Sequence, residues 1–148
     1  MKPWVAAIAR WLLAVLITTL IASITQTQFN LAALADLGQP VALGLRLQTT
    51  LLDLLRFAPL FAGIVAGGFL LALPLAALLL RRWPAQRWLM PAAGAVAILT
   101  ALLLMRGLLG LTPIAAARDV FGLLSLALAG ACGAGLAQAD FRSSKKLK

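Results

Sequence analysis

The charged side chains that could do chemistry in this 148-residue chain gather near the ends of its apolar stretches. Arg106 lies near the end of one stretch, and Arg118 and Asp119 lie near the start of the next. An arginine and an aspartate at one depth can pair as a clasp between helices, or can hold a charged substrate. We predict that Arg106 and Asp119 pair, with the clasp as the preferred interpretation. The predicted polar cluster also includes Asp53, Arg56 and Arg118.

The composition restricts this chemistry. The chain contains no His and no Tyr, a single Cys and four acidic residues. Without His there is no histidine-ligated haem, no histidine metal site and no histidine general base. A single Cys leaves no dithiol pair for electron exchange. We therefore predict no catalytic residue, no cofactor and no metal site, and we expect a protein that is not an enzyme.

Four apolar stretches must position these residues, and 63% of the chain is hydrophobic. The stretches are residues 4–24, 57–80, 88–109 and 120–137. A bilayer's hydrocarbon core of about 30 Å needs about 20 apolar residues of helix, and a helix satisfies its own backbone polar groups. The predicted fold is therefore an all-α membrane protein, a four-transmembrane-helix bundle forming one domain over residues 1–148.

The basic residues predict an orientation. Nine of the thirteen Lys and Arg flank the N-terminus, the connection between the second and third stretches, and the C-terminus. All four Trp lie on the same side. By the positive-inside rule both termini, with the tail at 140–148, are cytoplasmic in a bacterial inner membrane. The net charge of +9 is then topogenic; we predict contact with membrane lipids and no binding to nucleic acid.

The outer connection at residues 25–56 has its own pattern. Polar and less polar residues alternate over 26–31, and large aliphatic residues recur at every second position over 41–48. A period of two is typical of a strand. Residues 38–40, Gly-Gln-Pro, indicate a turn. We predict two short strands joined by a helical turn, that is, a short β-hairpin-like outer loop between the first two membrane helices.

Two sequence signals indicate where the second and fourth helices begin. Thr50 with Asp53 three residues later fits the capped start of the second helix. Thr112 followed by Pro113 fits the start of the fourth helix. Counting from Thr112 places Asp119 about two turns inside that helix, near the depth predicted for its arginine partner.

Small residues predict close packing between helices. Gly63 and Gly67 form a GxxxG pattern in the second stretch, and Gly130, Gly133 and Gly135 belong to a small-residue face in the fourth. Membrane helices associate where small residues let their backbones approach. Packing within the bundle is the preferred interpretation of both faces, and a homodimer is the alternative.

Three segments set among the four apolar stretches carry a resemblance, and they are QTQFNL, LRLQTTLLDLLRFAP and LLGLTPIAAAR. Through them the chain resembles small uncharacterised four-helix inner-membrane proteins of proteobacteria. The resemblance implies no named activity.

Two function classes stay open. In the first, the chain is a non-catalytic accessory, scaffold or assembly subunit of a membrane complex, recognising a partner through the outer loop at 25–56 or a small-residue helix face. In the second, it is a small homo-oligomeric transporter, channel or lipid-handling protein with its path beside Arg106 and Asp119. The scarcity of polar residues at mid-membrane favours the first class, because a conducting path needs groups that replace hydration.

Overall fold

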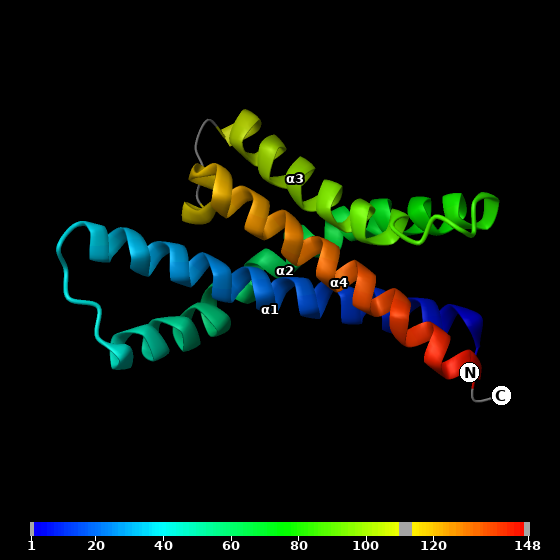
Figure 1. The fold of residues 1–148 in the computed structure, drawn as a ribbon, viewed down its shortest axis with the longest axis horizontal. Coiled ribbons are helices and arrows are strands. Elements are labelled where there is room, and N and C mark those ends of the chain that lie inside the picture. Colours follow the sequence, from blue (N-terminus) through cyan, green and yellow to red (C-terminus); the bar gives the residue numbers. More distant parts are fainter. Residues whose placement is uncertain (1, 110–113, 147–148) are drawn as a thin grey trace.

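The computed structural model describes residues 2–109 and 114–146, which form four long helices and one short 3₁₀ helix (Figure 1). The elements in chain order are α1 (Pro3–Asp36), α2 (Leu43–Arg82), α3 (Leu89–Leu109), η1 (Ala115–Arg118) and α4 (Val120–Lys146). No strand is present among these residues. The predicted all-α fold is confirmed.

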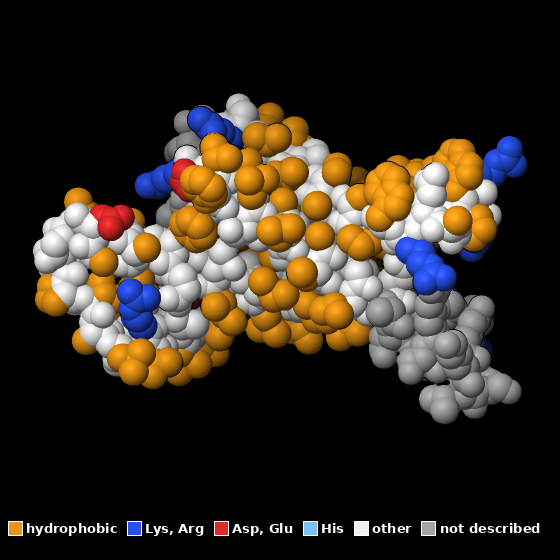
Figure 2. Space-filling view, viewed as in Figure 1, with side chains coloured by type: hydrophobic (Ala, Val, Ile, Leu, Met, Phe, Trp, Pro, Cys, Tyr) orange, Lys and Arg blue, Asp and Glu red, His pale blue; other side chains and the backbone are white. Residues whose placement is uncertain are grey.

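All four long helices are long and apolar enough to cross a membrane. Helix α1 has 34 residues and α2 has 40, which at 1.5 Å per residue is about 51 Å and 60 Å. Hydrophobic side chains cover the middle of the face seen in Figure 2, and its charged side chains lie toward the ends. The chain is a multi-pass integral membrane protein with four spans. Its first two helices exceed the hydrocarbon core of about 30 Å.

The helices are arranged so that both ends of the described chain lie at one end of the bundle, together with the α2–α3 connection (Figure 1). Helix α4 packs against α1 and α3, and α2 packs against the same two helices. The connections from α1 to α2 and from α3 to α4 lie at the opposite end. Because both described chain ends lie at the same end of the bundle, the chain crosses it an even number of times. The assignment of this end to the cytoplasm stays a prediction.

The predicted β-hairpin-like loop is wrong. Residues 26–31 continue α1, and α2 already begins at Leu43. An isolated two-stranded ribbon is marginal in water, whereas each helix pairs its own backbone groups. Aliphatic residues at 43, 47, 51 and 55 repeat every four residues, which is helical spacing. The two-residue alternation hid this longer repeat. We call residues 25–56, which extend past α3 and α4 in Figure 1, the outer arm.

The predicted turn at residues 38–40 is present, and it ends α1. Gly38 has a φ of 77°, a left-handed conformation that glycine adopts at no steric cost. Its N–H donates to Ala35 O at 2.9 Å, and the N–H of Gln39 donates to Leu34 O at 3.2 Å. These two bonds form a Schellman motif, which satisfies carbonyl groups at the end of the helix. The tip of the outer arm is therefore set by local chemistry.

The predicted start of the second helix at Thr50 is wrong. Helix α2 begins seven residues earlier, at Leu43. The Thr50 hydroxyl donates to Arg46 O at 2.7 Å, the internal bond of a threonine within a helix. Thr50 and Asp53 are therefore neighbouring residues within α2, and Thr50 does not cap the start of the helix.

The predicted start of the fourth helix, Thr112 and Pro113, lies outside the described residues. Helix α4 begins at Val120, and Asp119 Oδ2 accepts a hydrogen bond from the N–H of Phe121 at 3.0 Å. Asp119 therefore caps α4 instead of lying two turns inside a helix. Asp is favoured there because its carboxylate accepts a bond from an N–H group that has no partner within the helix.

Candidate functional site

Polar side chains follow one side of α1 and are buried in the bundle. They are Thr18, Thr19, Ser23, Gln26 and Thr27, each at most 5% exposed. Separations of three and four residues bring side chains together on one part of a helix surface. The part of α1 from Thr18 to Thr27 therefore holds buried polar groups that the predicted cluster of charged residues did not include.

Gln26 fastens the α3–α4 connection to α1. Its side-chain Oε1 accepts a hydrogen bond of 2.8 Å from the backbone N–H of Ala116 in η1. Ala116 is fully buried, and Ile114 and Ala117 beside it are buried as well. A buried N–H without a partner costs about 1–3 kcal/mol. This bond between residues ninety positions apart therefore fixes η1 against α1.

The hydroxyl groups nearer the middle of α1 are less well satisfied. Thr18 Oγ1 donates to Ala129 O over 3.4 Å. Among the described residues, Thr19 Oγ1 and Ser23 Oγ have no hydrogen-bond partner, and neither has the buried Trp11 Nε1. Unsatisfied polar atoms within a bundle are costly. They are therefore the atoms that gain most from a further hydrogen-bond partner.

Asp53 of α2 lies against this polar side of α1. The Thr27 hydroxyl donates to Asp53 Oδ2 at 2.7 Å and also lies 3.0 Å from Ser23 O. A hydrogen bond to an ionised carboxylate is roughly twice as strong as a neutral one. Asp53 is half-buried, so the bond joins α1 to α2 at the base of the outer arm.

A second polar network holds the outer arm together nearer its tip. The Arg46 guanidinium donates to Gln28 Oε1 at 3.2 Å, and Gln28 Nε2 donates to Thr50 Oγ1 at 3.4 Å. Arg46 and Gln28 are half-buried. The network joins α1 and α2 a second time, so the arm is a pair of helices fastened by side chains.

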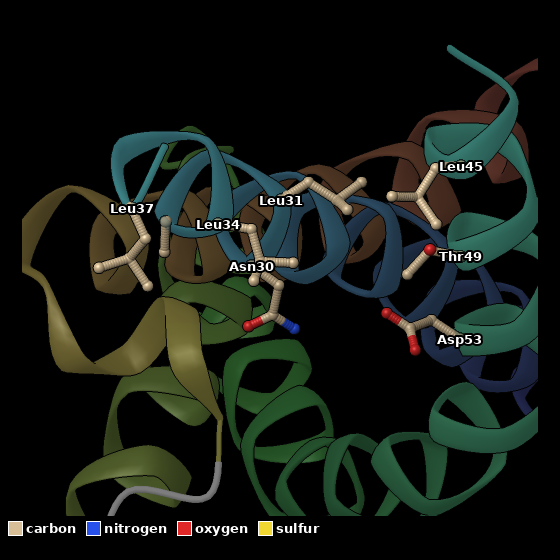
Figure 3. A pocket seen from close by; sticks show the side chains of 8 residues that line it. Asn30, Leu31, Leu34, Leu37, Leu45, Thr49 and Asp53 are labelled. Atoms are coloured by element: carbon tan, nitrogen blue, oxygen red, sulfur yellow. The ribbon is translucent and has the colours of Figure 1, made fainter. Parts of the chain in front are cut away.

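A pocket with a volume of about 450 Å³ opens between the two helices of the arm (Figure 3). Its polar lining is Asn30, Thr49 and Asp53. Its apolar lining is Leu31, Ala33, Leu34, Leu37 and Leu45. Figure 3 shows the side chains of Asn30 and Asp53 on opposite sides of the pocket, facing the space between α1 and α2. The pocket therefore combines one carboxylate and two neutral polar groups with an aliphatic wall.

The five residues of the predicted polar cluster do not all line this pocket. Arg56, Arg106, Arg118 and Asp119 are all exposed, and Asp53 alone of the five lines the pocket. Within the described part of the chain no ion pair joins Arg106 to Asp119. The predicted pairing depended on a depth for Asp119 inside α4, and the residue caps that helix instead.

The glycines of α4 lie where helices approach most closely. A Cβ atom at Gly133 would lie 2.7 Å from Ala14 O of α1, and one at Gly130 would lie 2.5 Å from Gly94 O of α3. A Cβ at Gly135 would meet a proline side chain of α3 at 3.3 Å. Contacts below 3.0 Å with backbone atoms leave no room for a side chain. The first two glycines therefore let α4 touch α1 and α3.

The two glycines of the GxxxG pattern in α2 have no such contact. A Cβ at Gly63 or Gly67 would meet no atom within 4 Å. Helix α2 packs inward through Phe61, Val65 and Phe69, which are at most 1% exposed. Gly63 and Gly67 each follow one of these residues by two positions, or about 200° around the helix. The GxxxG pattern therefore points away from the bundle.

The buried polar side of α1 was missed by the sequence predictions, although its spacing is visible. Thr19, Ser23, Gln26 and Asn30 follow one another at intervals of three or four residues. Interpreting residues 26–31 as a strand divided this repeat, so its outer half was assigned to a loop.

Comparisons of the chain with protein-family models, with curated proteins and with solved structures found no match. The resemblance to small proteobacterial inner-membrane proteins therefore stays a prediction. The function is inferred from the geometry of the described residues.

Proposed function

We propose that this protein is a non-catalytic accessory, scaffold or assembly subunit of a membrane complex, and that it binds a partner membrane helix through α2. The observation that carries the proposal is the open surface at Gly63 and Gly67, where an added Cβ would meet nothing within 4 Å. We call this surface the open α2 face.

Lipid explains why small residues matter more than leucines here. Exposed leucines cost nothing in a bilayer, because lipid tails are as apolar as they are. Glycine within a helix costs about 1 kcal/mol relative to alanine, and Gly63 and Gly67 gain no contact inside this subunit. A partner backbone packed on the open α2 face would supply that contact. Exposed Leu60 and Leu71 flank the glycines and would pack beside it.

We place the protein in the inner membrane of a bacterium with both termini in the cytoplasm. The distribution of Lys and Arg supports this orientation, and so does the shared end of the bundle at which both described chain ends lie. Arg81 and Arg82 in the last turn of α2 belong to the same end. The open α2 face then lies within the hydrocarbon core, available to another membrane protein.

The proposal is tested by the double variant Gly63→Leu/Gly67→Leu, purified with a tag in mild detergent. We expect wild type to co-purify a stoichiometric partner and the double variant to lose it, because the leucines hold the partner backbone away. The matched control is Gly107→Leu on α3, where a Cβ would also meet nothing within 4 Å. The control should keep the partner. Equal retention by both variants would refute the proposed surface.

A second candidate function is a small homo-oligomeric transporter, channel or lipid-handling protein. The observation in its favour is the pair of buried hydroxyls, Thr19 Oγ1 and Ser23 Oγ, that lack partners among the described residues and could serve a polar solute. A pure homo-oligomer with no other polypeptide would favour it. Flux into proteoliposomes should then fall in Ser23→Leu and persist in Ser125→Ala, whose hydroxyl bonds within α4.

A further inference from the structure

The pocket in the outer arm carries an inference that does not depend on the partner surface. Its volume of about 450 Å³ lies within the range of about 300–1,000 Å³ that small-molecule sites occupy. Its walls come from the end of α1 and the beginning of α2 (Figure 3). Two helices that are fastened to each other by side chains therefore shape it.

Two polar groups in the pocket retain hydrogen-bonding capacity. Asp53 Oδ2 accepts the Thr27 hydroxyl at 2.7 Å, whereas Oδ1 has no partner within the described part of the chain. The Asn30 side-chain amide likewise makes no bond to any described residue. Figure 3 shows Asn30 on α1 and Asp53 on α2, on opposite sides of the pocket. The pocket therefore offers one carboxylate oxygen and one amide to a ligand.

We propose that this pocket binds the primary ammonium group of an amphiphile, with Asp53 as its counter-ion. No Lys or Arg is among the described residues that line it, and no ion pair joins Asp53 to a described Lys or Arg. Asn30 and Thr49 would accept further bonds from the ammonium group through their side-chain oxygens. A single carboxylate suits a singly charged group. A divalent cation takes several oxygen ligands, and the described residues contain no cluster of acidic, His or Cys side chains for it.

The remaining lining indicates what carries the ammonium group. An aliphatic wall is formed by Leu34, Leu37 and Leu45. A fully hydrated small cation would gain no favourable contact with this wall, whereas an alkyl chain would pack against it. Asp53 lies four residues before the second predicted span, or about 6 Å along the helix. The headgroup layer extends about 5–8 Å beyond the hydrocarbon core on each side. The pocket then lies at headgroup depth, with ethanolamine lipids and free long-chain amines as the two sources of this chemistry.

The test measures binding of three probes to the purified full chain by native mass spectrometry. The probes are dodecylammonium, lysophosphatidylethanolamine and, as the anionic counterpart, lysophosphatidylglycerol of equal chain length. We expect at least one amine probe to bind and the glycerol lipid to bind at least about tenfold more weakly. Binding of the ethanolamine lipid only would identify a lipid headgroup site; binding of dodecylammonium only would identify a site for free amines. Equal binding of all three would overturn the inference.

Asp53→Asn is the decisive variant, because the amide oxygen still accepts the Thr27 hydroxyl while the charge is lost. Because the substitution removes a charge-assisted hydrogen bond to the ammonium group, amine binding should weaken about tenfold or more. The matched control is Asp36→Asn, since Asp36 is exposed and does not line the pocket. Asn30→Leu leaves the Asp53–Thr27 bond untouched and should weaken binding about threefold, so the test survives misfolding of the first variant. Unchanged amine binding in Asp53→Asn would overturn the inference.

The two proposals can fail separately. Gly63→Leu/Gly67→Leu should bind the amine probe as wild type does, because the open α2 face does not line the pocket. Asp53→Asn should keep the co-purifying partner. Loss of both properties in either variant would instead indicate misfolding, which gel filtration in detergent would reveal.

Discussion

Two glycine-containing surfaces of this protein, one on α4 and one on α2, differ in what lies opposite them. At Gly130 and Gly133 backbone atoms of neighbouring helices occupy the space that a Cβ would need. At Gly63 and Gly67 that space is open. Both surfaces have the composition that favours helix association in lipid, so composition does not tell an internal contact from a surface left for another chain. The geometry makes that distinction.

The two surfaces also differ in the side chains around their glycines. The contact of α4 with α1 includes the bond from the Thr18 hydroxyl to Ala129 O, and η1, which precedes α4, is bonded to Gln26 of α1. The open α2 face has exposed leucines beside its glycines. The bundle is therefore closed by close approach and hydrogen bonds around α4, while α2 keeps one face for lipid or a partner.

The largest effect is expected for Gly133→Leu. A Cβ at this position would lie 2.7 Å from Ala14 O, a backbone atom that cannot move without displacing α1. We expect a loss of at least about 3 kcal/mol in the free energy of unfolding, seen as little monodisperse protein in detergent and a lower Tm. A Gly133→Leu variant as stable as wild type would remove the distinction between the two glycine surfaces.

An intermediate effect is expected for Gln26→Leu. The substitution leaves the buried N–H of Ala116 without its acceptor, which should lower the free energy of unfolding by about 1–3 kcal/mol. Denaturant titration in mixed micelles measures this loss. Gln48→Leu is the control, because Gln48 is exposed. Equal losses in the two variants would show that η1 is not fastened through Gln26.

The smallest effect on stability is expected for Gly63→Leu/Gly67→Leu. Nothing within 4 Å opposes the new side chains, and leucine has a higher helix propensity than glycine. Unfolding in detergent should therefore show no loss of stability, although partner binding is abolished. A destabilisation as large as that of Gly133→Leu would mean that α2 packs inward through these glycines.

The four spans could be predicted from the sequence because long apolar stretches leave a chain few structures in a bilayer. The outer arm could not be predicted from the patterns used. Over 41–48 the leucines fit a period of two, and only residues 51 and 55 extend the repeat of four that indicates a helix. Short windows do not separate these two periods.

The site was predicted only in part, for a related reason. Asp53 was named, and it is the charged residue of the pocket. Its partner Thr27 and the pocket residue Asn30 were assigned to a strand, so the surface that they share with α2 was not predicted. Asp119 was placed by counting from Thr112 and Pro113, whereas it caps a helix that begins at Val120. Locating these residues depends on where helices begin, which is the part of a helix that sequence patterns fix least well.

The central claim is that the open α2 face is covered by another polypeptide in the native membrane. Its most direct test places a photo-crosslinking amino acid at residue 63, or at residue 107 as the comparison, in cells that express the full chain. The account predicts one discrete cross-linked product of a different polypeptide from residue 63 and none from residue 107. Identical results from the two positions, whether cross-linked or not, would contradict it.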